Sequence, residues 1–171
     1  MKTNKQSNKA IERICRIKGI KPETFEADMQ INFISMVKVI QTILPNLSAS
    51  NQSSIVLFSS VAASMGMPFH TSVAAAKGAI EGFAKALAAE YAPKIRVNVI
   101  APSLTDTPLA EKFLSNEEKK EKSAQRHPLK RVGTTDDMAQ MASFLLSEKS
   151  SWISGQVFHV DGGMSTLLVN Q

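Results

Sequence analysis

The stretch from Ser54 to Ala92 decides the fold of this chain: SIVLFSSVAASMGMPFHTSVAAAKGAIEGFAKALAAEYA. Its run of β-branched and aromatic residues, Ile55 to Phe58, predicts a strand buried on both faces. Such strands belong to parallel sheets that carry helices above and below. A loop follows the strand, and residues 72–91, with eight alanines, predict a long helix.

A helix is expected upstream of this stretch. Pro22 pre-sets the first helical turn, and apolar residues then recur every three or four positions as far as Leu44. Further apolar residues make this segment apolar on more than one side, as expected of a helix that packs on both a sheet and a partner subunit. Pro45 is expected to stop it, which gives a helix over residues 22–46.

Downstream, the pattern predicts a second buried strand over residues 95–101 and a last strand over 156–160, with a helix capped by Thr134 between them. A short apolar helix at 108–114 and a charged run, NEEKKEKSAQRH at 116–127, precede the capped helix. The run is most simply interpreted as a solvated helix face. The alternative is a mobile lid over a pocket.

This order alternates helices and strands and predicts a parallel sheet with helices on both faces. Ligands of such sheets bind beyond the carboxyl ends of the strands. Three segments fall at those ends: Ser59 with Ser60, residues 102–107, and residues 161–164. Their order and spacing alone predict that they converge on one site.

The net charge of +5 is unevenly distributed. Residues 1–21 carry seven Lys or Arg and one Glu, a net of +6, and the other 150 residues carry thirteen against fourteen, a net of −1. We therefore expect a basic, solvated leader at 1–21 and one globular domain at 22–171. A nearly neutral domain argues against nucleic-acid binding, which needs basic residues spread over a folded face.

Several classes of protein are excluded by composition. No apolar run approaches the roughly 20 residues that span a bilayer, and the leader lacks the apolar core of a secretory signal. The single cysteine, Cys15, cannot form an internal disulfide and suits a reducing, cytoplasmic compartment. The three histidines are far apart, and no Cys/His cluster has the spacing of metal ligands, so no metal site is predicted.

Five separated motifs together resemble the short-chain dehydrogenase/reductase family, in the style of its 3-oxoacyl-carrier-protein reductases and glucose dehydrogenases. The match covers about residues 22–168, and it is specific because the motifs occur in the family's order. The motifs are Asn32 within INFI, Ser60 at the end of the SIVLFSS strand, RVNVIAP at 96–102, HPLKRVGTTDD at 127–137, and SGQVFHVDGG at 154–163.

The resemblance implies roles for particular residues. Ser60, Lys77 and Asn32 would be catalytic, with Asn32 in the place of the asparagine that holds a proton-relay water. The cofactor would be NAD or NADP. Its binding residues would be Lys77, Pro102, Ser103, Thr105 and Thr107, with Thr107 contacting the nicotinamide carboxamide and Ser103 replacing a family glycine.

The first departure from the family lies in its Tyr-x-x-x-Lys motif, which here is Val73-Ala-Ala-Ala-Lys77. Residues four apart share a helix face, so the family's tyrosine and lysine lie together, and the lysine lowers the tyrosine pKa. Valine has no titratable group and cannot exchange a proton with a substrate. Tyr91 lies about five turns along the helix, too far to substitute. His70 is a candidate substitute, although a structural role for a loop histidine is the simpler interpretation.

The second departure concerns the beginning of the fold. The family begins with a strand, a glycine-rich turn and a helix that together cradle the cofactor's pyrophosphate, and no such motif occurs before residue 22. The expected fold class is therefore α/β: a partial Rossmann-like, doubly wound parallel sheet that lacks the N-terminal glycine-rich βαβ portion. Such a sheet would expose an edge that is normally covered.

Two functions remain open. The first is an NAD(P)-dependent oxidoreductase acting on a small carbonyl/hydroxyl pair. The second is a non-catalytic or truncated member that serves as a dimerisation or binding module. Either way, the resemblance implies a homo-oligomer formed through the helices at 22–46 and 72–92, without nucleic-acid or membrane partners.

Overall fold

The computed structural model describes residues 16–50 and 52–169. The residues of the predicted leader up to 15 lie outside this range. The helices and strands follow in the order η2 (Ile17–Gly19), α1 (Pro22–Met29), η3 (Gln30–Ile34), α2 (Ser35–Ala49), β1 (Ser53–Phe58), η4 (Val61–Ala63), α3 (Thr71–Tyr91), β2 (Ile95–Pro102), η5 (Pro108–Phe113), α4 (Glu117–Ala124), α5 (Thr135–Leu146), η6 (Glu148–Ser150) and β3 (Val157–Val160).

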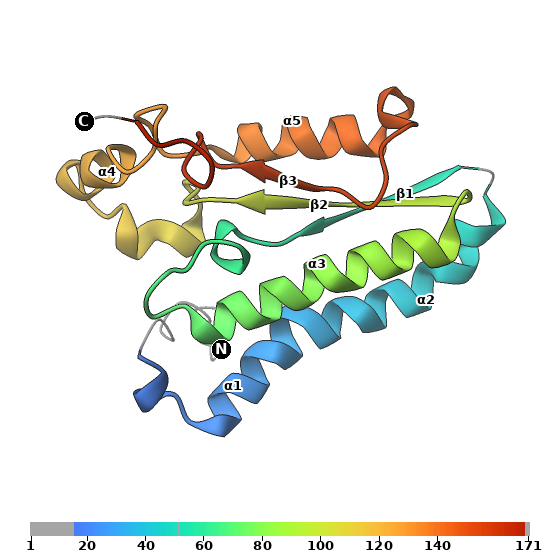
Figure 1. Cartoon of the computed structure of the whole chain (residues 1–171), viewed down its shortest axis with the longest axis horizontal. Helices are drawn as coiled ribbons and strands as arrows, with labels where there is room; N and C mark the ends of the chain where they lie inside the picture. The colour runs from blue at the N-terminus through green and yellow to red at the C-terminus, as the bar shows by residue number, and fades with distance from the viewer. Residues whose placement is uncertain (1–15, 51, 170–171) are drawn as a thin grey trace, which may run out of the picture.

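The three strands form one parallel sheet in the order β1-β2-β3. Figure 1 shows α1, α2 and α3 on one face of the sheet and α5 on the other, with α4 at the end toward which the strands point. The predicted parallel sheet with helices on both faces is therefore confirmed. In the described part of the chain, β1 pairs with β2 on one side only.

Alternation along the strands separates two apolar clusters. Ile55 and Leu57 of β1 and Val97 of β2 belong to the cluster that α2 and α3 cover. Val56 and Ile100, at the alternate positions, belong to the cluster under α5. A period of two residues places neighbours on opposite faces of a sheet, and this is why β2, the central strand, is buried from Val97 to Ala101.

Two polar residues of β2 hold the chain that follows α5. The Arg96 guanidinium donates hydrogen bonds to the carbonyl oxygens of Leu145, Ser147 and Ser150 at 3.0 Å each. Asn98, which is fully buried, donates to the Ile153 carbonyl at 2.9 Å. A cation satisfies the free carbonyls that end a helix, so this part of the RVN motif has a structural role here.

The helix predicted to stop at Pro45 continues to Ala49. Proline removes one backbone donor, which can be tolerated when the following turn is anchored by other contacts. Leu47 packs against the core, and its carbonyl accepts hydrogen bonds from the Ser50 amide at 3.3 Å and from Ser53 Oγ at 2.8 Å. These tertiary contacts therefore compensate for the backbone hydrogen bond that Pro45 cannot donate, and the helix continues past it.

The strand expected to be buried on both faces is buried on only part of its length. Ile55 and Leu57 are buried, whereas Phe58 at the end of β1 is 43% exposed. β1 lies at the edge of the three-stranded sheet, and its last residue, Phe58, lines a cavity. A continuous apolar run therefore predicts more burial for this strand than the structure shows.

Two glycines, Gly78 and Gly82, lie inside α3. A Cβ built at either position meets no atom within 4 Å. No other segment of the described chain packs there. This face of α3 is open.

The predicted cap of α5 is confirmed. Thr134 and Asp137 form a reciprocal capping box, in which the Thr134 amide donates to Asp137 Oδ2 at 2.7 Å. Arg131 adds two hydrogen bonds to the same carboxylate, at 2.6 and 2.7 Å. The Arg131 guanidinium, together with the Thr134 donors, holds the pKa of Asp137 well below its usual range.

Asp137→Asn is expected to lower the free energy of unfolding near neutral pH by about 0.5–1 kcal/mol, the typical value of a capping interaction. Because the folded pKa lies below the unfolded one, the carboxylate stabilises fully above about pH 4 and loses this effect as pH falls further. Urea unfolding at pH 7 and pH 3 should show the gap between wild type and variant shrinking in acid. Asp136→Asn, in the same helical turn, is the matched control. A gap that is independent of pH would contradict this account.

Candidate active site

A cavity of about 950 Å³ lies at the carboxyl ends of the strands. Its walls come from the end of β1 and the loop after it, the start of α3, the end of β2, and the η5–α4 segment. The three segments predicted to converge all reach it, through Ser59 with Ser60, residues 102–107, and Met164. The convergence expected from the order of the elements is therefore confirmed.

Ser60 lies just beyond the carboxyl end of β1, and its hydroxyl can still donate a hydrogen bond. Its Oγ accepts a hydrogen bond from the Ala62 amide at 3.2 Å, so the hydroxyl hydrogen remains available. The neighbouring Ser59 is buried, and its Oγ lies 3.1 Å from the Lys77 carbonyl oxygen and 2.7 Å from Glu81 Oε1. Ser59 thus fixes the end of the strand against α3 while Ser60 faces the cavity.

Lys77 reaches the same cavity from α3. Its ammonium donates to the Phe58 carbonyl oxygen at 3.1 Å, and burial lowers the pKa of Lys77 from its usual value. One of the three ammonium donors is thus used by the end of β1. The other two can serve hydroxyl or carbonyl oxygens of a ligand.

The segment from Pro102 to Thr107 forms another wall. Thr105 forms a parallel bridge with Gly133, and the Asp106 amide donates to the Gly133 carbonyl at 2.8 Å. A Cβ on Gly133 would lie 3.3 Å from Thr105 Oγ1 and 3.4 Å from the Leu104 carbonyl oxygen. Glycine at 133 permits this close approach, which holds the segment in place.

Sequence reasoning missed the role of His127. This histidine is buried, and its Nδ1 lies 2.9 Å from the Ser123 carbonyl oxygen, so that nitrogen carries the hydrogen. Its Nε2 lies 2.9 Å from Ser103 Oγ and accepts from the hydroxyl. Ser103, at the position where the family has glycine, therefore links the end of β2 to the α4 segment.

Two predicted site positions do not line the cavity. Asn32 lies in the π-helical turn η3, where its Nδ2 donates to the Asp28 carbonyl oxygen at 3.0 Å. Val73 lies in the first turn of α3 and is half-buried. Beside it, the Ser72 hydroxyl donates to the buried Asp28 carboxylate, a contact that joins α1 to α3.

His70 does reach the cavity. It is the residue that precedes α3, three positions before Val73, and its Nδ1 lies 2.8 Å from the Pro68 carbonyl oxygen. The hydrogen on Nδ1 points to that carbonyl, so the ring is oriented and Nε2 has no protein partner in the described part of the chain.

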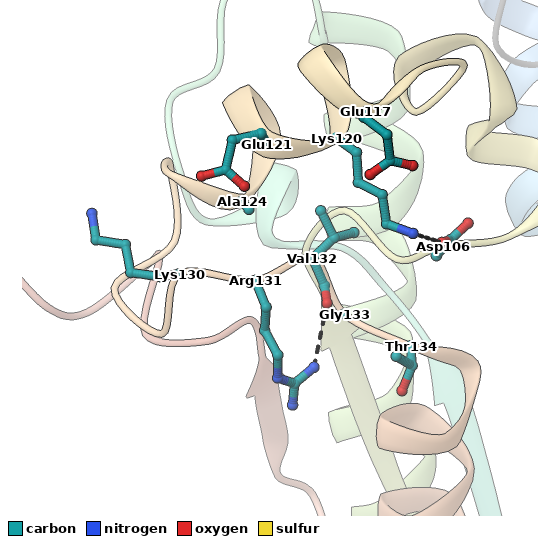
Figure 2. Close-up of a pocket in the computed structure, with 10 residues that line it drawn as sticks. All are labelled: Asp106, Glu117, Lys120, Glu121, Ala124, Lys130, Arg131, Val132, Gly133 and Thr134. Carbon is teal, nitrogen blue, oxygen red and sulfur yellow. Dashed lines mark hydrogen bonds and ion pairs between the residues drawn. The ribbon is translucent and has the colours of Figure 1, made fainter.

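A second, smaller depression of about 280 Å³ lies on the other side of α4 (Figure 2). Figure 2 shows Lys120 reaching Asp106, at 3.0 Å, with Glu117 and Glu121 on the same helix. Its lining mixes both signs of charge, and Asp106 neutralises its central lysine. We therefore place the candidate site in the larger cavity.

Neither a metal site nor a membrane span is indicated within residues 16–50 and 52–169. No group of three or more His, Cys, Asp or Glu side chains in this range could hold a metal ion. No helix there is both long and apolar enough to cross a bilayer.

Comparison with known proteins identifies a matching family model and relatives of similar sequence. A family model described as enoyl-(acyl carrier protein) reductase matches residues 7–165. A 3-oxoacyl-(acyl-carrier-protein) reductase of Thermotoga maritima is 36% identical over 92% of this chain and 64% of its own length. A protein of Xanthobacter autotrophicus named inactive 2-(S)-hydroxypropyl-CoM dehydrogenase 2 is 35% identical over 85% of this chain and 65% of its own length.

Solved structures share the fold. A gluconate 5-dehydrogenase from Burkholderia cenocepacia, in complex with NADP and tartrate, superposes with a TM-score of 0.84 at 26% identity, over 90% of this chain and 61% of its own. A 3-oxoacyl-(acyl-carrier-protein) reductase from Brucella melitensis gives 0.82 at 30% identity, over 90% of this chain and 57% of its own.

The chain thus spans less than two thirds of the length of these relatives. Within that span it shares the fold of the two solved structures, with TM-scores of 0.84 and 0.82, and the family model matches residues 7–165. This chain belongs to the short-chain dehydrogenase/reductase family of oxidoreductases.

Proposed function

We propose that this chain is an NAD(P)-dependent oxidoreductase that interconverts a carbonyl and a hydroxyl group in the larger cavity. The observation that carries the proposal is the convergence of Ser60, Lys77 and the segment from Pro102 to Thr107 on that one cavity. The first two supply oriented hydrogen-bond donors, and the segment supplies a wall for a planar ring.

The residues present fit the nicotinamide end of the cofactor. Lys77 keeps ammonium donors for the ribose hydroxyls, and Ser103, Thr105 and Thr107 offer side-chain oxygens on the facing wall. When bound, the nicotinamide supplies or accepts the hydride. Within residues 16–50 and 52–169, no glycine-rich turn joins a strand directly to a helix N-terminus. The proposal therefore assigns residues only to the nicotinamide and its ribose.

Ser60 orients the reacting carbonyl, since its hydroxyl hydrogen is free to bond to the carbonyl oxygen. The proton must come from another group, because Val73 has none to give. We propose that His70 Nε2 supplies the proton, since the ring lies in the cavity wall and its Nδ1 is held by the Pro68 carbonyl. Reduction then needs one proton from the imidazolium for each hydride transferred.

The reaction is tested by supplying NADPH, and separately NADH, that carries deuterium at the transferable position, with a series of small ketones. The proposal predicts alcohol that contains one deuterium atom, detected by mass spectrometry. Absence of deuterated alcohol at saturating cofactor, across aliphatic, aromatic and thioester-activated ketones, would contradict it.

A second candidate is a non-catalytic module that dimerises through α1, α2 and α3. Val73 favours it, because it removes the family's proton donor, and one relative carries the word inactive in its name. The helix surfaces also suit a partner: Ile31, Val39 and Ile43 are exposed. The open face at Gly78 and Gly82 would let a second helix approach closely.

Sedimentation tests this dimer directly. We expect a dimer or larger assembly at tens of micromolar, and we expect Val39→Glu to weaken it by at least tenfold, because a charge would be buried in an apolar interface. Gln41→Glu, also exposed on α2, is the matched control. A monomeric wild-type chain at that concentration would refute dimerisation, whether or not the chain is catalytic.

A further inference from the structure

The larger cavity contains a serine–histidine pair that the proposed reduction does not use as a pair. Ser103 and His127 both line the cavity, and the Ser103 hydroxyl donates to His127 Nε2 at 2.9 Å. His127 is 2% exposed, whereas Ser103 is only half-buried. The hydroxyl oxygen therefore borders the cavity, and the imidazole that accepts its hydrogen is shielded from solvent.

A third group orients the imidazole. His127 Nδ1 donates to the Ser123 carbonyl oxygen at 2.9 Å, and the hydrogen on Nδ1 leaves Nε2 as the acceptor. A nucleophile beside a base, with the base oriented by a third group, is the arrangement that activates a serine hydroxyl. The third group is a carbonyl here and not a carboxylate, so it stabilises an imidazolium less well, and we expect modest turnover.

The backbone that follows Ser103 is held in place as well. The Ser103 carbonyl oxygen accepts from Thr105 Oγ1 at 3.1 Å, and the Leu104 carbonyl oxygen accepts from the Gly133 amide at 3.1 Å. The Leu104 amide, in contrast, has no hydrogen-bond partner in the described part of the chain. The amide after a nucleophilic serine is a recurrent donor to the oxyanion that forms when the serine attacks a carbonyl. The Leu104 amide is available for this role.

A second serine–histidine contact shows what the first one adds. Ser64 Oγ lies 3.0 Å from His159 Nε2, but neither residue lines the larger cavity. Among the residues that the structure describes, no further hydrogen bond holds the His159 ring. An oriented base, an available neighbouring amide and a cavity occur together only at Ser103 within this range.

The cavity beside Ser103 suits an apolar acyl group. Leu109, Phe113 and Met138 line it, and its volume of about 950 Å³ is in the range of sites for small organic molecules. An ester carbonyl next to Ser103 could thus place its acyl chain against these three side chains.

We infer that Ser103 and His127 form a nucleophile–base pair that hydrolyses uncharged carboxylic esters with an apolar acyl group. Ser103 Oγ forms a bond to the ester carbonyl carbon, and its proton passes to His127 Nε2. The bond from that carbon to the alcohol oxygen then breaks, and the imidazolium returns the proton to the departing alcohol. The product of this half-reaction is an acyl-serine.

Water completes the cycle. His127 Nε2 takes a proton from water as the water oxygen attacks the acyl-serine carbonyl carbon. The bond to Ser103 Oγ breaks, the carboxylic acid leaves, and the imidazolium returns the proton to the serine. No electrons are transferred, so the reaction needs no nicotinamide and is independent of the proposed reduction.

The rate is measured with the whole chain and p-nitrophenyl butyrate, without cofactor, from the release of p-nitrophenolate. We expect Ser103→Ala and His127→Gln each to lower kcat/KM by about a hundredfold. The double variant should fall no further, because the two groups act as one unit. Ser64→Ala, at the other serine–histidine contact, is the matched control and should keep the wild-type rate. Equal rates for wild type and Ser103→Ala would overturn the inference, as would a wild-type rate no higher than that of buffer.

Covalent labelling tests the nucleophile itself. A fluorophosphonate reagent loses fluoride when a serine oxygen attacks its phosphorus, and mass spectrometry of the digested chain locates the adduct. We expect the adduct on Ser103, forming at least tenfold more slowly in His127→Gln. Adducts confined to other residues would overturn the inference.

Ser103→Gly guards against a variant that fails to fold. His127 is buried, so its replacement can disturb the packing, whereas Ser103→Gly removes only the hydroxymethyl group and introduces the residue that the family has there. Thermal unfolding curves identify the variants that fold normally. Loss of ester hydrolysis in a normally folded Ser103→Gly chain is the expected result, and retained hydrolysis would overturn the inference. Because no nicotinamide is present in these assays, their failure leaves the proposed reduction untouched, and the reverse also holds.

Discussion

Val73→Tyr is expected to raise kcat/KM for ketone reduction by about a hundredfold. A positioned acid typically contributes about 10²–10⁴-fold, and we expect the lower end because we propose that His70 supplies a proton in the wild type. The new phenol would stand four residues before Lys77, on the same side of α3, and it extends well beyond the valine side chain. The adjacent ammonium would favour the phenolate and so lower the phenol pKa.

The control for this substitution is Val73→Phe, which adds the same ring without its hydroxyl. Steady-state kinetics with NADPH should show a gain for tyrosine and none for phenylalanine. Equal activity of the two variants would show that ring packing, and not proton transfer, causes the effect. No gain with tyrosine, in a chain that binds cofactor, would show that the spacing from Val73 to Lys77 no longer serves catalysis.

His70→Phe is expected to lower kcat by about a hundredfold or more while KM changes little, because it removes the proposed proton donor and keeps a ring of similar size. His70→Ala should be partly rescued by imidazole added to the solution, since the small side chain leaves room for the missing ring. A purely structural role would give neither the kcat effect nor the rescue.

The double variant His70→Phe/Val73→Tyr separates the two donors. If either group can protonate the substrate, the tyrosine should restore the activity that the histidine substitution removes, and the two effects will not add. A double variant as inactive as His70→Phe, with a normal thermal unfolding curve and normal cofactor binding, would exclude position 73 as a site for the proton donor.

The strands could be predicted from local patterns because each is a largely apolar run. Ile55 to Phe58 and residues 95–101 both indicate buried strands without reference to any partner, whereas the central place of β2 comes only from the structure. Pro45 could not be judged locally, because the packing of Leu47 and its hydrogen bonds with distant Ser53 hold the last turn. The exposure of Phe58 could not be predicted either, because no local pattern indicates that the end of β1 borders a cavity.

The candidate site was only partly predictable. The strand order places Ser60 and the segment from residue 102 at one edge, and this requires no knowledge of side-chain contacts. The bond from Ser103 to His127 spans 24 positions without periodicity, so no local pattern indicates it. The predicted role of Asn32, holding a proton-relay water, stays a prediction. Its side-chain amide donates to the Asp28 carbonyl oxygen one helical turn earlier, and Asn32 does not line the cavity.

The charged run at 116–127 shows a different difficulty. It was interpreted most simply as a solvated face, and its alternative was a lid. Both descriptions treat the run as a whole, although the sign of the charge depends on the side of α4. Spacing separates Lys119, Lys122 and Arg126 from Glu117 and Glu121, but only the structure shows which side meets the cavity.

The proposed oxidoreductase function depends on the larger cavity being the nicotinamide half of a cofactor site. Titration of NADH and NADPH into the purified chain, followed by nicotinamide fluorescence, tests this most directly. We predict saturable binding in the micromolar range, weakened at least tenfold by Lys77→Met, because the ammonium would be lost from the ribose site. No saturable binding of either cofactor, or binding that is unchanged in Lys77→Met, would contradict the account.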